Sequence, residues 1–386
     1  MTRNLFLAAF FLTCACATSR TDGIAIPIEV LDDRLPLAQV RINGSRPLTF
    51  IVDTGASSGT FVDRALAAEL GLSEDSAQAE ANPGGEVTVG TVKGATLEIG
   101  PLTLTNETLL TAPISQFASL LGRPVDGILG HSFLSRYAVR FDYVGRRLVL
   151  DEANRAGVEL PLVITRRMPM IDVTLHHHGR RIPARVEIDT GSFEILGLNG
   201  SFADATALLA AGDRRLEEKG VAFGGETQGF RARIDSFEVG PFELRGPAVS
   251  ITTDAGGYES AVQFAGVLGA EALRRFDLII DYPHDRVFLR PNRRFKDPWI
   301  EDLTGLRLSA TPPAFRQKKV ADVFQGSPAM DAGLRPDDEI VAIDDTPVAD
   351  LSLVETVRLL RIGDSRMTVL REGKTIELTL RPRPMI

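Results

Sequence analysis

An internal repeat built around the tripeptide Asp-Thr-Gly limits the possible folds of this chain more than any other feature. Residues 46–62 read RPLTFIVDTGASSGTFV, and residues 181–197 read RIPARVEIDTGSFEILG. In each segment an apolar or alternating run, typical of a β-strand, leads into the turn-forming Asp-Thr-Gly. A hairpin signal precedes each run, Asn43-Gly44 in the first half and His178-Gly179 in the second. The repeat therefore predicts two halves of similar fold.

The two halves continue to match downstream of Asp-Thr-Gly. An apolar pair between glycines occurs in both, at residues 127–130 (GILG) and residues 266–269 (GVLG). From there the halves align without a gap, and the matching positions are Leu134 with Leu273, Arg136 with Arg275, Tyr137 with Phe276, Phe141-Asp142-Tyr143 with Ile280-Asp281-Tyr282, and Arg147 with Arg286. A duplication explains this register.

Short β-rich segments dominate both halves, so we expect a mainly β protein. Segments that alternate or are rich in β-branched residues, bounded by Gly or Pro, predict strands at 86–92, 95–99, 147–150, 230–239 and 286–289. Short helices are expected at 62–70, 131–137, 202–211 and 271–276.

The repeated strand, Asp-Thr-Gly and apolar-apolar-Gly pattern resembles that of pepsin-like and retroviral-type aspartic proteases over about residues 25–292. The resemblance implies a two-lobed acid-protease fold, with lobes at 24–155 and 156–295, and makes Asp53 and Asp189 the catalytic carboxylates. Peptide hydrolysis by water needs a base and an acid. Two adjacent carboxyls supply both, because they cannot both ionise easily and so share one proton.

The residues beside the two aspartates support them in this interpretation. Glycine at 55 and 191 keeps each turn free of Cβ clashes, so that the carboxyls can approach. By resemblance to the family, Thr54 and Thr190 hydrogen-bond across the lobe interface, and the 128–130 and 267–269 segments pack behind the active-site loops.

Ser192 follows the second Asp-Thr-Gly, whereas Ala56 follows the first. A serine hydroxyl can donate to a carboxylate and lower its pKa, which alanine cannot do. We therefore expect an activity optimum nearer weakly acidic or neutral pH than that of a strongly acid-adapted enzyme. Gly84-Gly85 and Gly224-Gly225 predict hairpins that act either as flaps over the cleft or as ordinary turns. The first hairpin lacks the tyrosine that pepsin-like enzymes usually place there.

Residues 300–386 resemble a bacterial PDZ domain. The segments 326–329 (GSPA), 332–336 (AGLRP) and 339–343 (EIVAI) carry the resemblance, with a helix expected at 352–361. The family usually has Gly-Asp where this chain has Asp337-Asp338, and the loop for a peptide carboxylate is not recognisable in 309–317. The resemblance implies an α+β domain that binds peptides, with a C-terminal peptide as one candidate ligand.

The N-terminus has the layout of a secretory signal peptide. Arg3 precedes an apolar run from Leu5 to Leu12, and small residues end at Ala17, so 1–17 are expected to be removed and the protein exported to the periplasm or envelope. Both cysteines lie in this segment. In a second interpretation Cys16 becomes the lipid-anchored first residue of a lipoprotein. A net charge of −8 argues against nucleic acid as a partner.

The run His176-His177-His178 suggests a metal site, but we expect an exposed hairpin turn, because neighbouring side chains of a strand point to opposite faces. No cofactor or metal is therefore expected. The leading hypothesis is an exported endopeptidase that binds a peptide or protein in the inter-lobe cleft, with the PDZ domain recruiting a substrate or partner. The alternative is a catalytically silent envelope scaffold whose PDZ domain binds peptides, and a third is an enzyme that cleaves only itself or one partner.

Overall fold

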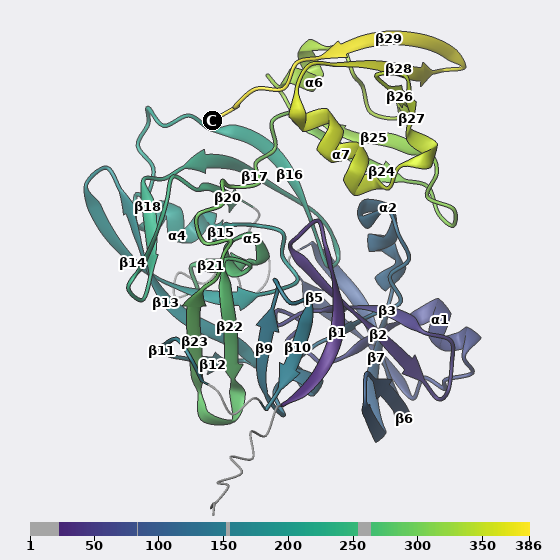
Figure 1. Ribbon diagram of the computed structural model, residues 1–386, viewed down its shortest axis with the longest axis vertical. Helices are drawn as coiled ribbons and strands as arrows, with labels where there is room; N and C mark the ends of the chain where they lie inside the picture. The colour runs from purple at the N-terminus through teal and green to yellow at the C-terminus, as the bar shows by residue number, and fades with distance from the viewer. Residues whose placement is uncertain (1–22, 83, 152–154, 254–263) are drawn as a thin grey trace, which may run out of the picture.

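The computed structural model describes residues 23–386 except residues 83, 152–154 and 254–263. The expected export segment, with Cys14 and Cys16, lies outside the described residues. Within them the chain forms three β-sheets and short helices, so the expected mainly β fold is confirmed (Figure 1). Among the helices of this part, none combines the length and apolar character needed to cross a membrane.

The largest sheet joins the two halves of the repeat. Its strands, in spatial order, are β11 (Val158–Pro161), β23 (Arg286–Pro291), β22 (Phe276–Asp281), β9 (Ala138–Asp142), β10 (Arg147–Leu150), β1 (Ile24–Leu31), β2 (Leu35–Ile42), β3 (Leu48–Val52), β8 (Gly127–Leu129), β4 (Phe61–Asp63), β7 (Leu102–Ala112), β6 (Gly85–Ile99) and β5 (Ser76–Asn82). The halves meet where β9 pairs antiparallel with β22, with Phe141 opposite Leu278. Both strands are buried along almost their whole length, because one continuous apolar core includes residues of both halves.

The second sheet lies within the second half. Its strands, in order, are β16 (Leu216–Ala222), β17 (Gly225–Arg233), β20 (Ala248–Thr252), β15 (Leu196–Asn199), β21 (Gly266–Gly269), β14 (Arg180–Asp189), β13 (Met168–His177), β18 (Ser236–Val239) and β19 (Phe242–Arg245), with β12 (Val163–Thr165) beside β13.

The same pairing scheme occurs in both halves. The strand that leads into Asp-Thr-Gly pairs parallel with the strand that carries the apolar pair between glycines (Gly-Φ-Φ-Gly, where Φ is an apolar residue): β3 with β8, and β14 with β21. The strand that follows Asp-Thr-Gly pairs antiparallel with that same partner: β4 with β8, and β15 with β21. A long hairpin, β5–β6 or β16–β17, completes each half. The sequence repeat is thus accompanied by a repeat in strand pairing.

The third sheet belongs to the C-terminal part, which has a core of its own. Its strands are β24 (Leu306–Ala310), β25 (Lys318–Val323), β26 (Glu339–Ile343), β28 (Ser365–Arg371) and β29 (Lys374–Leu380), with β27 (Thr346–Pro347) beside β26. The helix α7 (Leu353–Ile362) begins with a capping box between Ser352 and Glu355, which satisfies the first free N–H groups. Figure 1 shows this part, in yellow, above α2 of the first half, and α2 contacts β24.

The helices of the described residues are short. They are α1 (Arg64–Glu69), α2 (Ala118–Leu121), α3 (His131–Leu134), α4 (Gly200–Ala205), α5 (Ala270–Leu273), α6 (Pro328–Asp331) and α7, with 3-10 turns η1 (Ile114–Phe117), η3 (Tyr282–His284) and η4 (Val348–Asp350). The expected helix 202–211 ends early because Ala207 adopts φ 47° and its N–H turns back to the Asp204 carbonyl.

The expected strand 230–239 is two strands. The chain changes partners within it, since β17 pairs with β16 and β20, whereas β18 pairs with β13 and β19. The buried apolar positions shift phase at the break, from Ala232 and Ile234 to Phe237 and Val239, so the sequence pattern did contain a sign of it at Asp235-Ser236. The expected strands 86–92 and 95–99, in contrast, are one strand, β6, with irregular pairing between Val92 and Ala95.

Candidate active site

Two parallel strand pairs bring Asp53 and Asp189 to the centre of the molecule. Asp53 follows β3, and its N–H donates to the carbonyl of Leu129 in β8 at 3.0 Å. Asp189 ends β14, opposite Gly269 in β21. The Gly-Φ-Φ-Gly strands therefore lie beside the Asp-Thr-Gly turns, where the sequence repeat predicted them.

Hydrogen bonds between Thr54 and Thr190 join the two turns. The N–H of Thr54 donates to Oγ1 of Thr190 at 3.1 Å, and the N–H of Thr190 donates to Oγ1 of Thr54 at 3.0 Å. Each hydroxyl in turn donates to a carbonyl of the opposite half, Thr54 to Ile188 and Thr190 to Val52 at 2.8 Å. Both threonines have 0% exposure, so this reciprocal set is fully shielded from water. The expected hydrogen bonds across the interface are present.

The glycines of the two turns allow the carboxyls to approach. A Cβ on Gly55 would lie 2.9 Å from Cγ of Asp189, and a Cβ on Gly191 would lie 2.4 Å from Cγ of Asp53. Both distances are shorter than a carbon–carbon contact of 3.5 Å or so. Each glycine thus lies against the carboxyl of the other half, and any side chain there would displace that carboxyl.

Burial and mutual repulsion control the ionisation of the pair. Loss of hydration raises the pKa of Asp53 well above the usual range, and the charge of Asp189 raises it further. Burial also raises the pKa of Asp189, against the N–H groups of Gly191 (2.8 Å) and Ser192 (3.1 Å), which both donate to Oδ1. The singly protonated pair is therefore favoured at higher pH than it would be for two exposed carboxyls.

Ser192 acts differently from the sequence expectation. It contacts Asp189 through its backbone N–H, while its Oγ accepts the N–H of Glu194 at 3.2 Å. On the other side, the backbone N–H of Ala56 lowers the pKa of Asp53 in the same way. The expected hydroxyl asymmetry between Ser192 and Ala56 is wrong, because both residues use the backbone group that every residue except proline has.

Tyr143 and Tyr282, which occupy matching positions of the sequence repeat, lie near the two aspartates. Burial raises the pKa of Tyr143 and of Tyr282, and the charge of Asp189 acts on Tyr143 as that of Asp53 acts on Tyr282. Each tyrosine therefore senses the aspartate of the opposite half and stays neutral. Their matching positions in the two halves are the sequence signal that could have identified them as residues of the site.

The two long hairpins meet above a cavity that contains both aspartates. The N–H of Gly84, at the tip of β5–β6, donates to the carbonyl of Phe223 at the tip of β16–β17, 3.1 Å away. The ring of Phe223 lies 5.7 Å from that of Phe61 and 6.2 Å from that of Phe117. The tip of the second hairpin is thus packed against aromatic residues of the first half.

The cavity has a volume of about 710 Å³ and extends to the C-terminal part. Besides Asp53 and Asp189, it is lined by Leu306 and Leu308 of the edge strand β24 and by Arg361 of α7. The edge strand of the third sheet and the aspartate pair therefore border one continuous space.

One wall of this cavity is charged. Nε of Arg231 lies 2.7 Å from Oε2 of Glu218, and the hydroxyl of Ser250 donates to Oε2 of Glu194 at 2.7 Å. Burial raises the pKa of Glu218, partly offset by Arg231, while Glu194 raises it further. Glu218, Arg231 and Ser250 lie on β16, β17 and β20, and Glu194 precedes β15. Single-strand patterns did not identify them as cavity residues.

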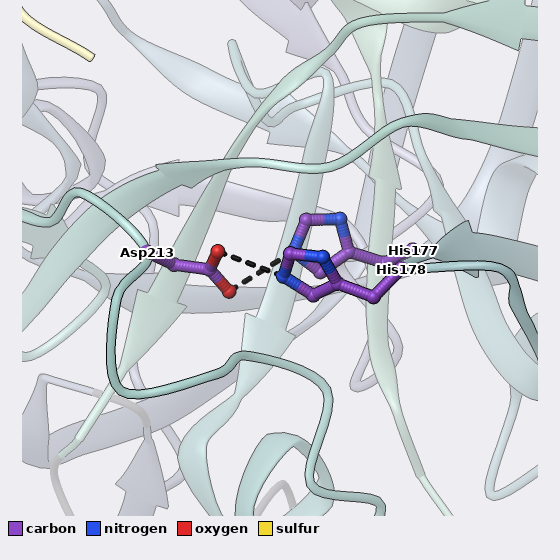
Figure 2. Close-up of side chains that lie close together, drawn as sticks. All are labelled: His177, His178 and Asp213. Carbon is purple, nitrogen blue, oxygen red and sulfur yellow. Dashed lines mark hydrogen bonds and ion pairs between the residues drawn. The ribbon is translucent and has the colours of Figure 1, made fainter.

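The hairpin turn expected at the three histidines is present at His178-Gly179, and His178 is half-exposed, but the expected exposure is wrong for His177. His177 is 5% exposed, and its ring centroid lies 3.9 Å from that of His178 (Figure 2). Alternation fails because His178 (φ 50°) and Gly179 (φ 71°) form a turn with two positive φ angles. His177, His178 and Asp213 offer three ligand atoms within 4.8 Å of one another, the kind of group that can hold a metal ion.

In the C-terminal part, the departure from the usual Gly-Asp has a local explanation. Asp337 adopts φ 69°, a conformation that glycine takes more readily. Asp338 is 1% exposed and accepts two hydrogen bonds from the guanidinium of Arg371, both at 2.7 Å. The loop 311–317 lies over Lys318, whose Nζ donates to the carbonyl of Phe315 at 2.8 Å.

Comparison with known proteins finds two separate matches, one in the first half of the chain and one in the C-terminal part. Residues 38–133 match the model of an aspartyl protease family, and residues 319–371 match that of a PDZ domain. The protease match includes Asp53 and ends before Asp189. A crystal structure of a retropepsin-like aspartic protease from Rickettsia conorii is 22% identical and aligns over 33% of this chain and 97% of its own, with a TM-score of 0.25. The first half of the chain is thus similar to an aspartyl protease family over residues 38–133, and its C-terminal part is similar to a PDZ domain over residues 319–371.

Proposed function

We propose that this protein is an aspartic endopeptidase in which Asp53 and Asp189 activate water together. The observation that carries the proposal is the reciprocal contact of the two turns, in which each glycine lies against the carboxyl of the other half, the two threonines exchange two hydrogen bonds and each hydroxyl donates to a carbonyl of the opposite half. Such an arrangement fixes two buried carboxyls side by side, which a merely structural pair of turns does not need.

In this mechanism the pair shares one proton. The ionised carboxylate takes a proton from water as the water oxygen attacks the peptide carbonyl carbon, and the protonated carboxyl donates its proton to the carbonyl oxygen. The resulting tetrahedral diol then collapses: the amide nitrogen receives the proton held by the pair, a diol hydroxyl returns its proton to the pair, the C–N bond breaks, and a free acid and an amine leave. The pair ends with one proton, as it began.

The proposal includes a two-lobed, pepsin-like body derived by duplication, with lobes at 24–155 and 156–295 and a PDZ domain at 300–386. The repeated strand-pairing scheme supports it. A substrate would lie extended in the cavity beneath the two hairpins, and the contact between Gly84 and Phe223 would have to open to admit it.

We further propose that the PDZ domain recruits substrate. An edge strand can extend its sheet with a peptide, and β24 borders the cavity that holds both aspartates. Binding at β24 would raise the local concentration of the peptide at the pair. Export, with or without a lipid anchor at Cys16, stays part of this proposal, and mass spectrometry of the mature N-terminus tests it.

A fluorogenic peptide library, read from about pH 3 to about pH 8, tests the activity. We expect cleavage by the wild type, loss in both Asp53→Asn and Asp189→Asn, and no change in Asp75→Asn, whose carboxylate lies at the surface near Lys93. If the wild type cleaves nothing while the chain still binds peptides, the scaffold hypothesis replaces the enzyme.

A further inference from the structure

The turn between β13 and β14 and the loop after α4 bring three ligand groups together, away from the aspartate pair. Nε2 of His177 lies 3.1 Å from Oδ2 of Asp213, and Nε2 of His178 lies 2.8 Å from Oδ1 of the same carboxylate (Figure 2). Figure 2 shows both rings on one side of the turn, facing the carboxylate. Two imidazoles and one carboxylate form a donor set that suits Zn²⁺ and neighbouring transition metals.

The loop that carries Asp213 is fixed in place. Oδ2 of Asp213 accepts the N–H of Ala210 at 2.7 Å. Arg180, the first residue of β14, donates to the carbonyls of Thr206 and Ala207, both at 2.6 Å, and so ties the loop to the turn. The ligands need little rearrangement to bind an ion, which lowers the cost of ordering them.

A second carboxylate stands where a metal-binding histidine usually has one. Oδ1 of Asp235 lies 3.5 Å from Nδ1 of His177, and Oδ2 accepts the backbone N–H of His178 at 2.9 Å. A histidine that binds a metal through one nitrogen commonly directs its other N–H at a carboxylate, which fixes the ring and its tautomer. Asp235 thus lies on the Nδ1 side of His177, at ion-pair distance rather than in a hydrogen bond, while Nε2 is the ring atom that faces Asp213.

Metal binding requires the two imidazoles in their neutral form. Because protons and metal compete for the imidazoles, binding weakens in acid.

We propose that His177, His178 and Asp213 form a binding site for a divalent transition-metal ion, Zn²⁺ above all, with a fourth position open to water. The site lies at one end of β14 and Asp189 at the other, a separation of about 30 Å at the usual rise per residue. The ion therefore joins the β13–β14 turn to the loop after α4 and takes no part in peptide hydrolysis.

Calorimetric titration of Zn²⁺ into the full chain, freed of metal by a chelator, tests the site. We expect one ion per chain, with affinity at least about tenfold weaker in Asp213→Asn and in His178→Gln. Because the side chain of His178 is half-exposed, we expect His178→Gln to fold as the wild type does. The matched control is His176→Gln, since His176 lies in the same run but faces Glu238 at 3.2 Å and should bind as the wild type does.

Thermal unfolding gives a second measurement. Zn²⁺ should raise the midpoint for the wild type and for His176→Gln, because an ion that binds only the folded chain stabilises it, and should leave Asp213→Asn and His178→Gln unchanged. The proposal fails if the wild type takes up no Zn²⁺ at millimolar concentration. It also fails if all four proteins bind alike, or if His176→Gln loses as much affinity as His178→Gln.

Discussion

Burial of Asp53 and Asp189 lowers the stability of the folded chain when they are ionised, because a buried carboxylate loses its hydration. A carboxyl whose folded pKa is raised contributes stability that is fully present below its unfolded pKa and is lost as pH rises through the folded pKa. The directions of both shifts therefore predict that the ionised dyad destabilises the fold at neutral pH.

Replacing Asp53 with asparagine should remove this penalty. We expect Asp53→Asn to have a higher thermal midpoint than the wild type at pH 7, with the advantage shrinking as the pH falls and the wild-type pair regains its protons. Thermal unfolding followed at several pH values measures it. A midpoint for Asp53→Asn that lies below the wild type at neutral pH would contradict the assignment of a buried, strained charge.

The pH dependence of activity follows from the same shifts. The active, singly protonated pair exists between two apparent pKa values, and both are raised, so the optimum of kcat/KM should lie in the weakly acidic range. The direction agrees with the expectation from Ser192, but the cause is burial. We expect Ser192→Ala to keep the optimum of the wild type, and an optimum below about pH 3 would count against the account.

Gly191 provides a test of close approach. Alanine there would bring a Cβ within 2.4 Å of Cγ of Asp53 and push the carboxyl aside. A displacement of 1 Å at reacting groups costs about 100-fold in rate, so we expect a loss of at least that size in kcat. Gly363→Ala, where nothing lies within 4 Å, is the control and should cleave normally.

At the scale of elements, helix α5 connects the protease part to the segment before the PDZ domain. Glu271 is fully buried and accepts from the guanidinium of Arg274 at 2.7 Å and from that of Arg275 at 3.1 Å. Arg275 also donates to the carbonyl of Asp297 at 2.6 Å, and its guanidinium lies 3.8 Å from the ring centre of Trp299. This network fastens residues 297–299 to α5.

Removing the acid should therefore be costly. Glu271→Gln removes the one carboxylate charge that both buried guanidinium groups share and leaves Arg274 with Asp297 at 3.4 Å, and we expect a loss of about 3–5 kcal/mol in the free energy of unfolding. Urea denaturation of the full chain measures it. Glu243→Gln, which removes an exposed pair with Arg245, should have little effect because solvent screens that pair. Equal losses in the two variants would show that Glu271 does not hold residues 297–299 against α5.

How far the sequence predicted the elements depended on whether the signal was local. Hairpin turns at Asn43 and His178 and the strands before Asp-Thr-Gly could be predicted, because turn chemistry and apolar patterns act over a few residues. The contact of Asp213 with His177 could not be predicted, since it depends on how the loop that carries Asp213, 36 residues further along the chain, folds back onto the β13–β14 turn. The positive φ of His178, which breaks strand alternation, is likewise set by the turn as a whole.

At the scale of the whole molecule, the proposed function depends on how the two halves and the C-terminal part surround one cavity. Two halves with the same strand pairing share one core, and their hairpin tips meet over a cavity that the PDZ edge strand also borders. The repeat predicted the two matching halves, whereas nothing local in the sequence placed β24 next to the aspartate pair. That placement is what supports the proposal that a peptide is captured and cleaved in one space.

The most direct test of the central claim is identification, by mass spectrometry, of the new N-termini that the protein generates in an extract of envelope proteins. The account predicts a set of cleavage sites made by the wild type and absent from both Asp53→Asn and Asp189→Asn. Cleavage sites that persist unchanged in either variant would contradict it, because neither carboxyl can then be required for attack by water.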